Sequence, residues 1–160
     1  MCDYLGLSTG ALDFVAAAQA QDMWCWAACV QTILNWYGVA IDQQSIVSRV
    51  LGAPVNEPGT EETISASLNG WGFHANGRRF VVRSRVAGGA PPLQILFREF
   101  ARQHPVLVTF NEGGASIGHA VVLTSISRIG SEITSLVYRD PWPSAQNIAR
   151  TGRKSWTCSG

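Results

Sequence analysis

The sequence predicts a single-domain α+β protein, with helices in its N-terminal half and an antiparallel sheet in its C-terminal half. At 160 residues the chain has the length of one domain. Its residues are 46% hydrophobic and 14% charged, a balance typical of a packed globular core. Helical periodicity dominates up to about residue 103 and β-rich runs follow, an order that indicates helices segregated from a sheet. We therefore expect one domain over residues 1–160, with about residues 1–18 as an N-terminal extension.

The strongest predicted element is a helix over residues 25–37. Apolar residues occupy nearly all of its faces, which indicates a central, buried helix, and Gly38 is its stop signal. Asp42 and Thr60 are expected to cap the two helices that follow. The further elements are expected in this order: helices over 43–52 and 60–70, a strand over 78–86, a helix over 91–103, and strands over 104–110, 119–129 and 132–140.

Charge and hydropathy exclude several classes of protein. A formal net charge of +1 gives no electrostatic reason to expect nucleic acid or a membrane surface as the main partner. No apolar run reaches the roughly 18–20 residues that span a bilayer. Asp3 and the missing basic n-region argue against a secretory signal. We expect a protein that is cytoplasmic or exported by a specialised secretion system.

The spacing of the four cysteines predicts neither a disulfide framework nor a zinc site. They are too few and too unevenly spaced for a disulfide scaffold, although a bridge between Cys2 and Cys158 stays open. No CxxC pair is present, so a zinc site is not expected. No metal or organic cofactor is expected.

Cys25 stands at the start of the predicted central helix. Unpaired N–H groups and the helix dipole favour an anion there, and the thiolate is the nucleophilic form of cysteine. Cys29, one turn further on, is expected to be packed core. Gln19 and Gln21 precede Cys25, and a glutamine amide together with the Cys25 N–H could stabilise an oxyanion.

His119 and Asp140 lie at the ends of two consecutive predicted strands. His119 begins one strand, and Asp140 finishes the next. With a short turn near Ile129, the register is expected to bring the two side chains level, so that the carboxylate can orient the imidazole.

These motifs together resemble a known superfamily. "QAQDMWCWAACVQTILNWYG" (19–38), "GHAVVLTSI" (118–126) and "YRDPWP" (138–143) resemble the papain-like cysteine peptidases, and are similar to the compact bacterial C39-like and C70 (AvrRpt2-type) families. The resemblance implies a papain-like fold with the nucleophile on the central helix. It assigns the nucleophile to Cys25, the base to His119, the orienting carboxylate to Asp140 and the oxyanion donor to Gln19.

The resemblance further implies a peptidase that cleaves protein or peptide substrates, and we expect it to be a monomer. Small bacterial relatives are often secreted effectors or toxins, which suggests an inhibitor or immunity protein as a further partner. Trp24, Gly118 and Trp142 are expected at the substrate cleft, and Trp142 either shields the His–Asp pair or anchors a turn. An acyltransferase or deamidase with the same triad, and a catalytically silent interaction module, are the alternatives.

Other polar residues have a simpler interpretation. His74 and His104 lack an acid partner at the family's spacing and are expected in a loop or at a strand edge. The arginines near residue 80 are expected on a solvated strand face, with a basic patch for an acidic partner as the alternative. These are Arg78, Arg79, Arg83 and Arg85.

Overall fold

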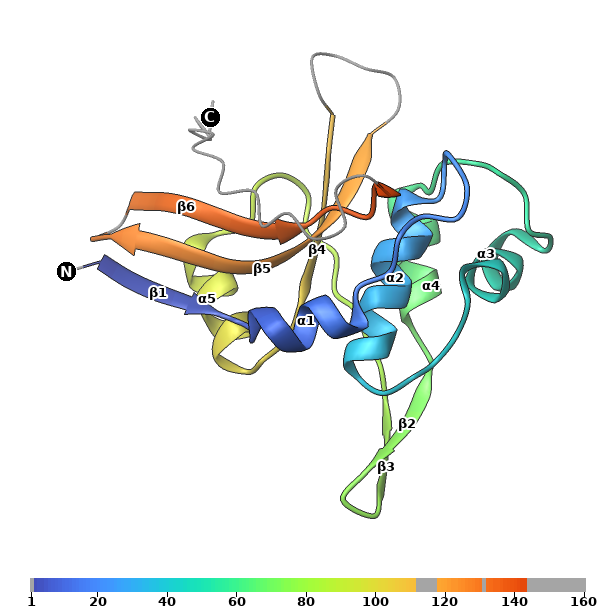
Figure 1. Ribbon diagram of the computed structural model, residues 1–160, viewed down its shortest axis with the longest axis horizontal. Helices are drawn as coiled ribbons and strands as arrows, with labels where there is room; N and C mark the ends of the chain where they lie inside the picture. The colour runs from blue at the N-terminus through green and yellow to red at the C-terminus, as the bar shows by residue number, and fades with distance from the viewer. Residues whose placement is uncertain (1, 112–117, 131, 144–160) are drawn as a thin grey trace.

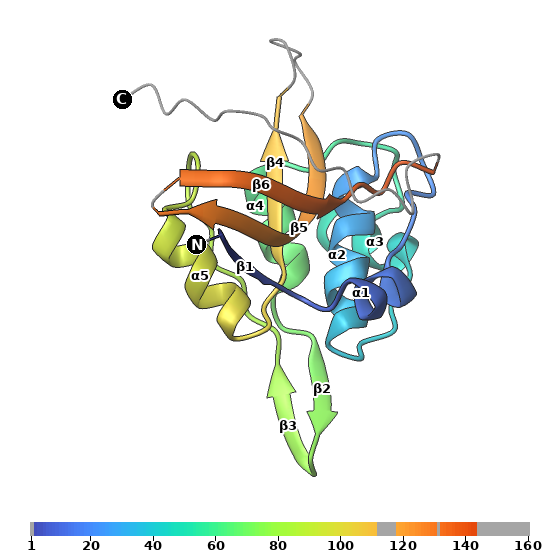
Figure 2. The ribbon, with the colours of Figure 1, turned by 60° about the vertical axis from the view of Figure 1, so that its left-hand side comes forward.

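The computed structural model describes residues 2–111, 118–130 and 132–143 (Figure 1). The helices are α1 (Thr9–Val15), α2 (Cys25–Trp36), α3 (Gln43–Leu51), α4 (Glu61–Leu68) and α5 (Leu93–Ala101). The strands are β1 (Cys2–Gly6), β2 (Gly72–Ala75), β3 (Arg78–Val81), β4 (Val106–Phe110), β5 (His119–Ile129) and β6 (Glu132–Arg139). Helices α2, α3 and α4 gather beside an antiparallel sheet, as Figures 1 and 2 show, so the molecule is α+β.

The sheet is built around the long strand β5. Within the described residues, β6 pairs with one edge of β5, and β4 and β1 pair end to end with the other. The residues expected as an N-terminal extension supply β1 and α1, and Leu7 and Leu12 are buried in the core. The nearly buried Arg139 of β6 binds Asp13 of α1 at 2.7 Å and ties this segment to the sheet.

Helix α2 forms the centre of the molecule, as its apolar faces predict. Eight of its twelve residues are buried. Ala120 and Val122 of β5 pack in the same hydrophobic cluster as α2. Leu123 and Ile126 of β5 instead pack with α1 and α5 in a second cluster. Because α2 is packed so closely against β5, its first residue lies beside the start of that strand.

The predicted helix signals are confirmed. Asp42 accepts a hydrogen bond from the Ser45 N–H, and Thr60 accepts one from the Thr63 N–H. Gly38 has φ +78°, a left-handed conformation that follows the last turn of α2.

The expectation that β5 and β6 bring His119 level with Asp140 is wrong in register. Arg139 pairs with Val122, so a continued ladder would set Asp140 opposite Val121. Two register irregularities, near Leu123/Ser125 and Ser127/Arg128, occur along the ladder. Asp140 is thus a diagonal neighbour of His119, offset by two residues along the ladder. Diagonal neighbours on one face of a sheet remain within reach of each other's side chains.

The strand expected over residues 78–86 is shorter than predicted and belongs to a hairpin. β3 ends at Val81, and it pairs with β2 in a separate two-stranded sheet. Ser84 leaves this ribbon because its N–H donates to the Asn69 side chain. The hairpin projects from the body of the molecule in both views (Figures 1 and 2).

Candidate active site

Cys25 is the first residue of α2, and the helix has no side-chain cap there. Its N-cap residue is Trp24, which makes no capping hydrogen bond, whereas Ser8, Asp42 and Thr60 cap α1, α3 and α4. The first N–H groups of α2 are therefore available to an anion. The Trp26 and Ala120 N–H groups donate to the sulfur of Cys25.

His119 lies between Cys25 and Asp140. Its Nε2 is 2.9 Å from Asp140 Oδ1, and since an ionised carboxylate can only accept, Nε2–H is the donor. The imidazole is also hydrogen bonded to the side chain of Cys25. The Trp142 N–H donates to Asp140 Oδ1 at 3.0 Å and helps to orient the carboxylate.

The ionisation of this group favours a thiolate beside an imidazolium. The hydrogen bond that His119 donates to Asp140 raises the pKa of His119 to about 9, with a further contribution from Cys25 and against the effect of burial. Burial acts to raise the pKa of Cys25, but the hydrogen bonds from His119 and from backbone N–H groups outweigh it, and the pKa is lowered from 9.0. The two groups titrate as a pair, and the charged pair is stabilised.

Cys29 differs from Cys25 although one helical turn separates them. It is 1% exposed, and burial raises its pKa well above 9.0, with the charges of Cys25 and Asp140 acting in the same direction. A buried thiol with a raised pKa is a poor nucleophile. Cys29 is therefore core, as expected.

The two tryptophans that flank Cys25 hold one loop, residues 53–59. The Trp24 indole N–H donates to the Val55 carbonyl at 2.8 Å, and the Trp26 indole N–H donates to the Glu57 carbonyl at 3.1 Å. Gly59 lies against the Trp26 ring, where a Cβ would come within 2.6 Å of Cγ. This loop fixes the start of α2, and with it the position of Cys25.

Gln19 is buried, and its amide is directed at the backbone ahead of Cys25. Nε2 donates to the Gln21 carbonyl at 3.1 Å and to the Asp22 carbonyl at 2.9 Å. Exchanging the amide atoms would set Oε1 against two carbonyl oxygens, so the orientation is settled. Oε1 is buried without a hydrogen-bond partner among the described residues. The Gln19 N–H donates to the Pro141 carbonyl at 2.8 Å, next to Asp140.

Gln43, at the start of α3, holds the backbone on both sides of Gln19. Its Nε2 donates to the Ala18 carbonyl at 2.6 Å and to Gln31 Oε1 at 2.9 Å, and its Oε1 accepts from the Ala20 N–H at 2.9 Å. The sequence does not single out this residue. A glutamine that follows a capping aspartate reads as an exposed first-turn residue, whereas Gln43 is 7% exposed.

Trp142 borders a hollow beside Gln19. The hollow has a volume of about 300 Å³ and is lined by residues of two segments, Gln19–Asp22 and Trp142–Pro143. Trp142 is 47% exposed, so its ring is accessible. Gln21 lines the same hollow.

The two other residues expected at the cleft, Trp24 and Gly118, differ in exposure. Trp24 is only 5% exposed, and its side chain belongs to the core and to the 53–59 loop. Gly118 is exposed just before His119, next to the Asn111 side chain.

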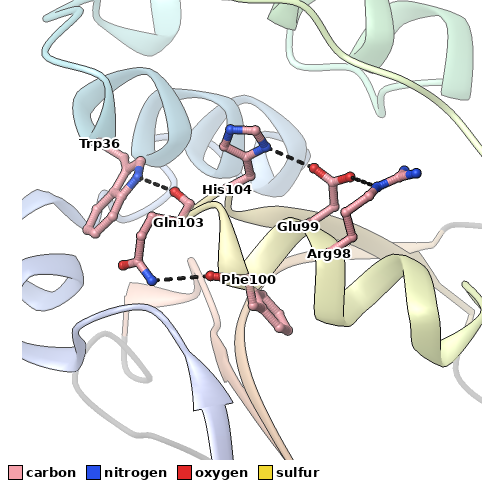
Figure 3. Close-up of polar contacts among 6 residues, drawn as sticks. All are labelled: Trp36, Arg98, Glu99, Phe100, Gln103 and His104. Atoms are coloured by element: carbon pink, nitrogen blue, oxygen red, sulfur yellow. Dashed lines mark hydrogen bonds and ion pairs between the residues drawn. The ribbon is translucent and has the colours of Figure 1, made fainter.

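A second histidine–carboxylate pair lies away from this site, where the sequence indicated none. His104 Nδ1 is 2.9 Å from Glu99 Oε2, and the Arg98 guanidinium binds the other Glu99 oxygen at 3.1 Å (Figure 3). His74 is exposed on β2, opposite Arg79. Within the described residues, no three His, Cys, Asp or Glu side chains cluster so as to hold a metal ion.

A thiol at an uncapped helix N-terminus, hydrogen bonded to a histidine that a carboxylate orients, is the arrangement of a thiol hydrolase. The family model "Papain-like cysteine protease AvrRpt2" matches residues 8–156 of the chain. The chain belongs to this family, and it is a papain-like cysteine peptidase. No curated protein and no solved structure gave a significant match.

Proposed function

We propose that the protein hydrolyses peptide bonds in protein substrates, with Cys25 as nucleophile, His119 as general base and acid, and Asp140 as the orienting carboxylate. The observation that carries the proposal is the hydrogen-bonded series Cys25–His119–Asp140 at the uncapped start of α2. The site supplies each group that covalent catalysis by a thiol requires.

In the proposed mechanism the Cys25 thiolate attacks the substrate carbonyl carbon, and the carbonyl oxygen becomes an oxyanion. The imidazolium of His119 then protonates the leaving amine as the C–N bond breaks. Water, deprotonated by the neutral imidazole, attacks the thioester and releases the acid. Asp140 holds the imidazole through Nε2, which leaves Nδ1 for these proton transfers.

The oxyanion is proposed to bind the Cys25 N–H and the amide of Gln19. In the free protein Gln19 Nε2 donates to the carbonyls of Gln21 and Asp22. One of these hydrogen bonds is therefore proposed to be replaced by a hydrogen bond to the substrate oxygen. Catalytic hydrogen bonds often form fully only with substrate bound. Gln19→Ala is expected to lower kcat by about 10²- to 10³-fold without slowing the alkylation of Cys25, because alkylation forms no oxyanion.

A peptide library incubated with the protein tests the proposal. Mass analysis is expected to find cut chains with the wild type and none with Cys25→Ala. An uncut chain of altered mass would instead indicate deamidation or acyl transfer. Cys29→Ala is the matched control, since it removes the neighbouring thiol and is expected to leave both cleavage and the iodoacetamide labelling of Cys25 in place.

Protein substrates follow from the peptidase family, whereas the biological role is a proposal. An effector or toxin role, with an inhibitor or immunity protein as partner, rests on the family alone. None of the helices in the described residues combines the length and the apolar character that a membrane span requires.

A further inference from the structure

Basic residues are concentrated in one part of the chain. Residues 63–98 contain five of the twelve Lys and Arg residues and none of the eleven Asp and Glu residues. These five are Arg78, Arg79, Arg83, Arg85 and Arg98. Since the whole chain has a formal net charge of +1, the remainder of the molecule is net acidic. A charge separation of this kind attracts an acidic partner to one place on the surface.

Most of this charge lies on or next to the arm, which we define as the β2–β3 hairpin, residues 72–81. In both ribbon views the arm projects beyond the C-terminal end of α2, away from the end that carries Cys25 (Figures 1 and 2). Tyr37, which follows α2, packs on Phe73 at the base of the arm, with ring centroids 5.6 Å apart. An occupant of the arm would therefore leave the candidate active site free.

The arm presents both apolar and cationic groups to solvent. Phe73 and Phe80 stack across the hairpin at 5.3 Å, yet Phe80 is 42% exposed and the adjacent Val81 is 46% exposed. Arg79 lies opposite His74, on the other face of the ribbon. Within the described residues β2 and β3 pair with no other strand, so the outer edges of the ribbon are open to an added strand.

Four of the five arginines of this region form no ion pair with a carboxylate in the described part of the chain; Arg98 is the exception. Arg98 and Arg139 form ion pairs with carboxylates, whereas Arg78 and Arg79 form none, and neither do Arg83 and Arg85. Charge, exposed apolar side chains and open strand edges together suit an extended acidic polypeptide, which can pair along an edge while its carboxylates reach the guanidinium groups.

We propose that the arm docks an acidic, extended segment of the polypeptide substrate, at a distance from Cys25. That the docked segment belongs to a substrate rests on the proposed peptidase function, whereas the docking itself does not. Docking at the arm raises the effective concentration of the rest of the same chain at the active site. The arm thereby favours substrates that carry an acidic segment outside the bond that is cut.

Binding to the arm can be measured directly by fluorescence anisotropy. The probe is a fluorescein-labelled twelve-residue peptide of alternating Glu and Thr, titrated with the Cys25→Ala protein at low salt so that no cleavage interferes. Arg78→Glu/Arg79→Glu is expected to weaken binding by at least about tenfold, because charge repulsion replaces attraction. Arg78→Lys/Arg79→Lys is the matched control and is expected to retain most of the affinity.

Three outcomes would overturn the docking. One is arm-independent binding, with equal affinity for the wild-type and the Glu variant. The second is an absence of binding up to about 1 mM protein. The third is tighter arm-dependent binding of a twelve-nucleotide single-stranded DNA or of phosphatidylglycerol vesicles than of the peptide. Circular dichroism of each variant, together with unchanged iodoacetamide labelling of Cys25 in a Cys25-containing background, establishes that the fold is intact.

A kinetic comparison then tests whether the arm serves the substrate. A fluorogenic peptide that the enzyme cleaves is made with and without an appended Glu–Thr tail. The tail is expected to lower KM for the wild type and not for Arg78→Glu/Arg79→Glu, with kcat on the untailed peptide equal in both proteins. Cleavage without a tail effect would overturn the substrate role. An inactive wild type would refute the peptidase proposal, and the anisotropy result would still decide the docking.

Discussion

The two histidine–carboxylate pairs have the same separation and very different surroundings. In both, a ring nitrogen lies 2.9 Å from a carboxylate oxygen. The His119 and Asp140 side chains are 28% and 14% exposed, whereas those of His104 and Glu99 are 43% and 26% exposed. His119 is also hydrogen bonded to Cys25 at the start of α2, while His104 packs edge-on against Tyr37.

In the proposed mechanism an oriented imidazole does not by itself define a catalytic site. Glu99 binds both His104 and Arg98. The hydrogen bond from His104 is the main cause that lowers the pKa of Glu99, burial acts against it, and the hydrogen bond from Arg98 lowers it further. Asp140 acts through His119 on a thiol that receives N–H donors from Trp26 and Ala120. In the proposed mechanism the reactive group is the Cys25 thiol, and the His119–Asp140 pair acts through its contact with that thiol.

The largest expected effect comes from His119→Gln, which removes the proposed base and keeps a polar side chain. Cleavage of a peptide substrate is expected to fall by about 10⁵-fold or more, and the iodoacetamide labelling of Cys25 at neutral pH is expected to slow because the thiolate loses its imidazolium. Steady-state kinetics and labelling followed by mass spectrometry measure the two effects. Activity retained within tenfold would assign the base elsewhere.

Asp140→Asn is expected to reduce kcat/KM by about 10²- to 10⁴-fold and to change the pH profile. In the proposed mechanism, activity requires both the ionised Cys25 thiol and the protonated His119. The activity of the wild type should therefore rise as the Cys25 thiol ionises and fall as pH increases through about 9, where His119 loses its proton. Without the carboxylate the pKa of His119 is lower, and the alkaline limb of the profile moves to lower pH. An unchanged alkaline limb would show that Asp140 does not control this ionisation.

Gln43→Leu is expected to reduce kcat by about 10- to 100-fold with a smaller change in KM. The substitution leaves the Ala18 carbonyl and the Ala20 N–H without their partner, and so loosens the backbone that carries Gln19. Each buried group left unpaired destabilises the protein by about 1–3 kcal/mol, which urea unfolding measures.

Labelling separates this positioning role from a general loss of structure. Iodoacetamide should react with Cys25 in Gln43→Leu at the wild-type rate, since alkylation needs the thiolate and not the oxyanion site. Gln43→Glu keeps the acceptor for the Ala20 N–H but loses the donor to the Ala18 carbonyl. Its kcat is expected to lie between that of the wild type and that of Gln43→Leu. A parallel loss of labelling and kcat would contradict the positioning role.

The local features of the structure could be predicted from the sequence, and fewer of the long-range features could. Helix caps at Asp42 and Thr60 depend on neighbours three residues away, and they were predicted correctly. The register of β5 and β6 was not, because bulges are set by packing that the spacing of His119 and Asp140 does not reveal. The proximity of these two residues was expected for the wrong register, and a diagonal contact provides it.

The burial of polar side chains is the second feature that could not be predicted from the sequence. Trp24 and Gln43 are polar-tipped side chains whose partners lie 31 and 23 residues away, at Val55 and Ala20. No periodicity of the chain reports such a pairing. Similarly, His104 has Glu99 as its partner because the chain turns back at the end of α5. The spacing expected for a catalytic pair gives no sign of this contact.

The smallest expected effect comes from His104→Gln, the counterpart of His119→Gln. Activity is expected to stay within about twofold of the wild type, because His104 contacts no reacting group, and the free energy of unfolding should fall by less than about 1 kcal/mol at neutral pH. The lowered pKa of Glu99 gives a contribution that is present above its unfolded-state pKa near 4.5 and is lost as pH falls through the folded-state value. The stability difference between His104→Gln and the wild type should therefore shrink in acid, as urea unfolding at a series of pH values can measure. A large loss of activity at neutral pH, with stability unchanged, would contradict this prediction. It would show that both histidine–carboxylate pairs are needed for activity, although only one of them contacts a thiol.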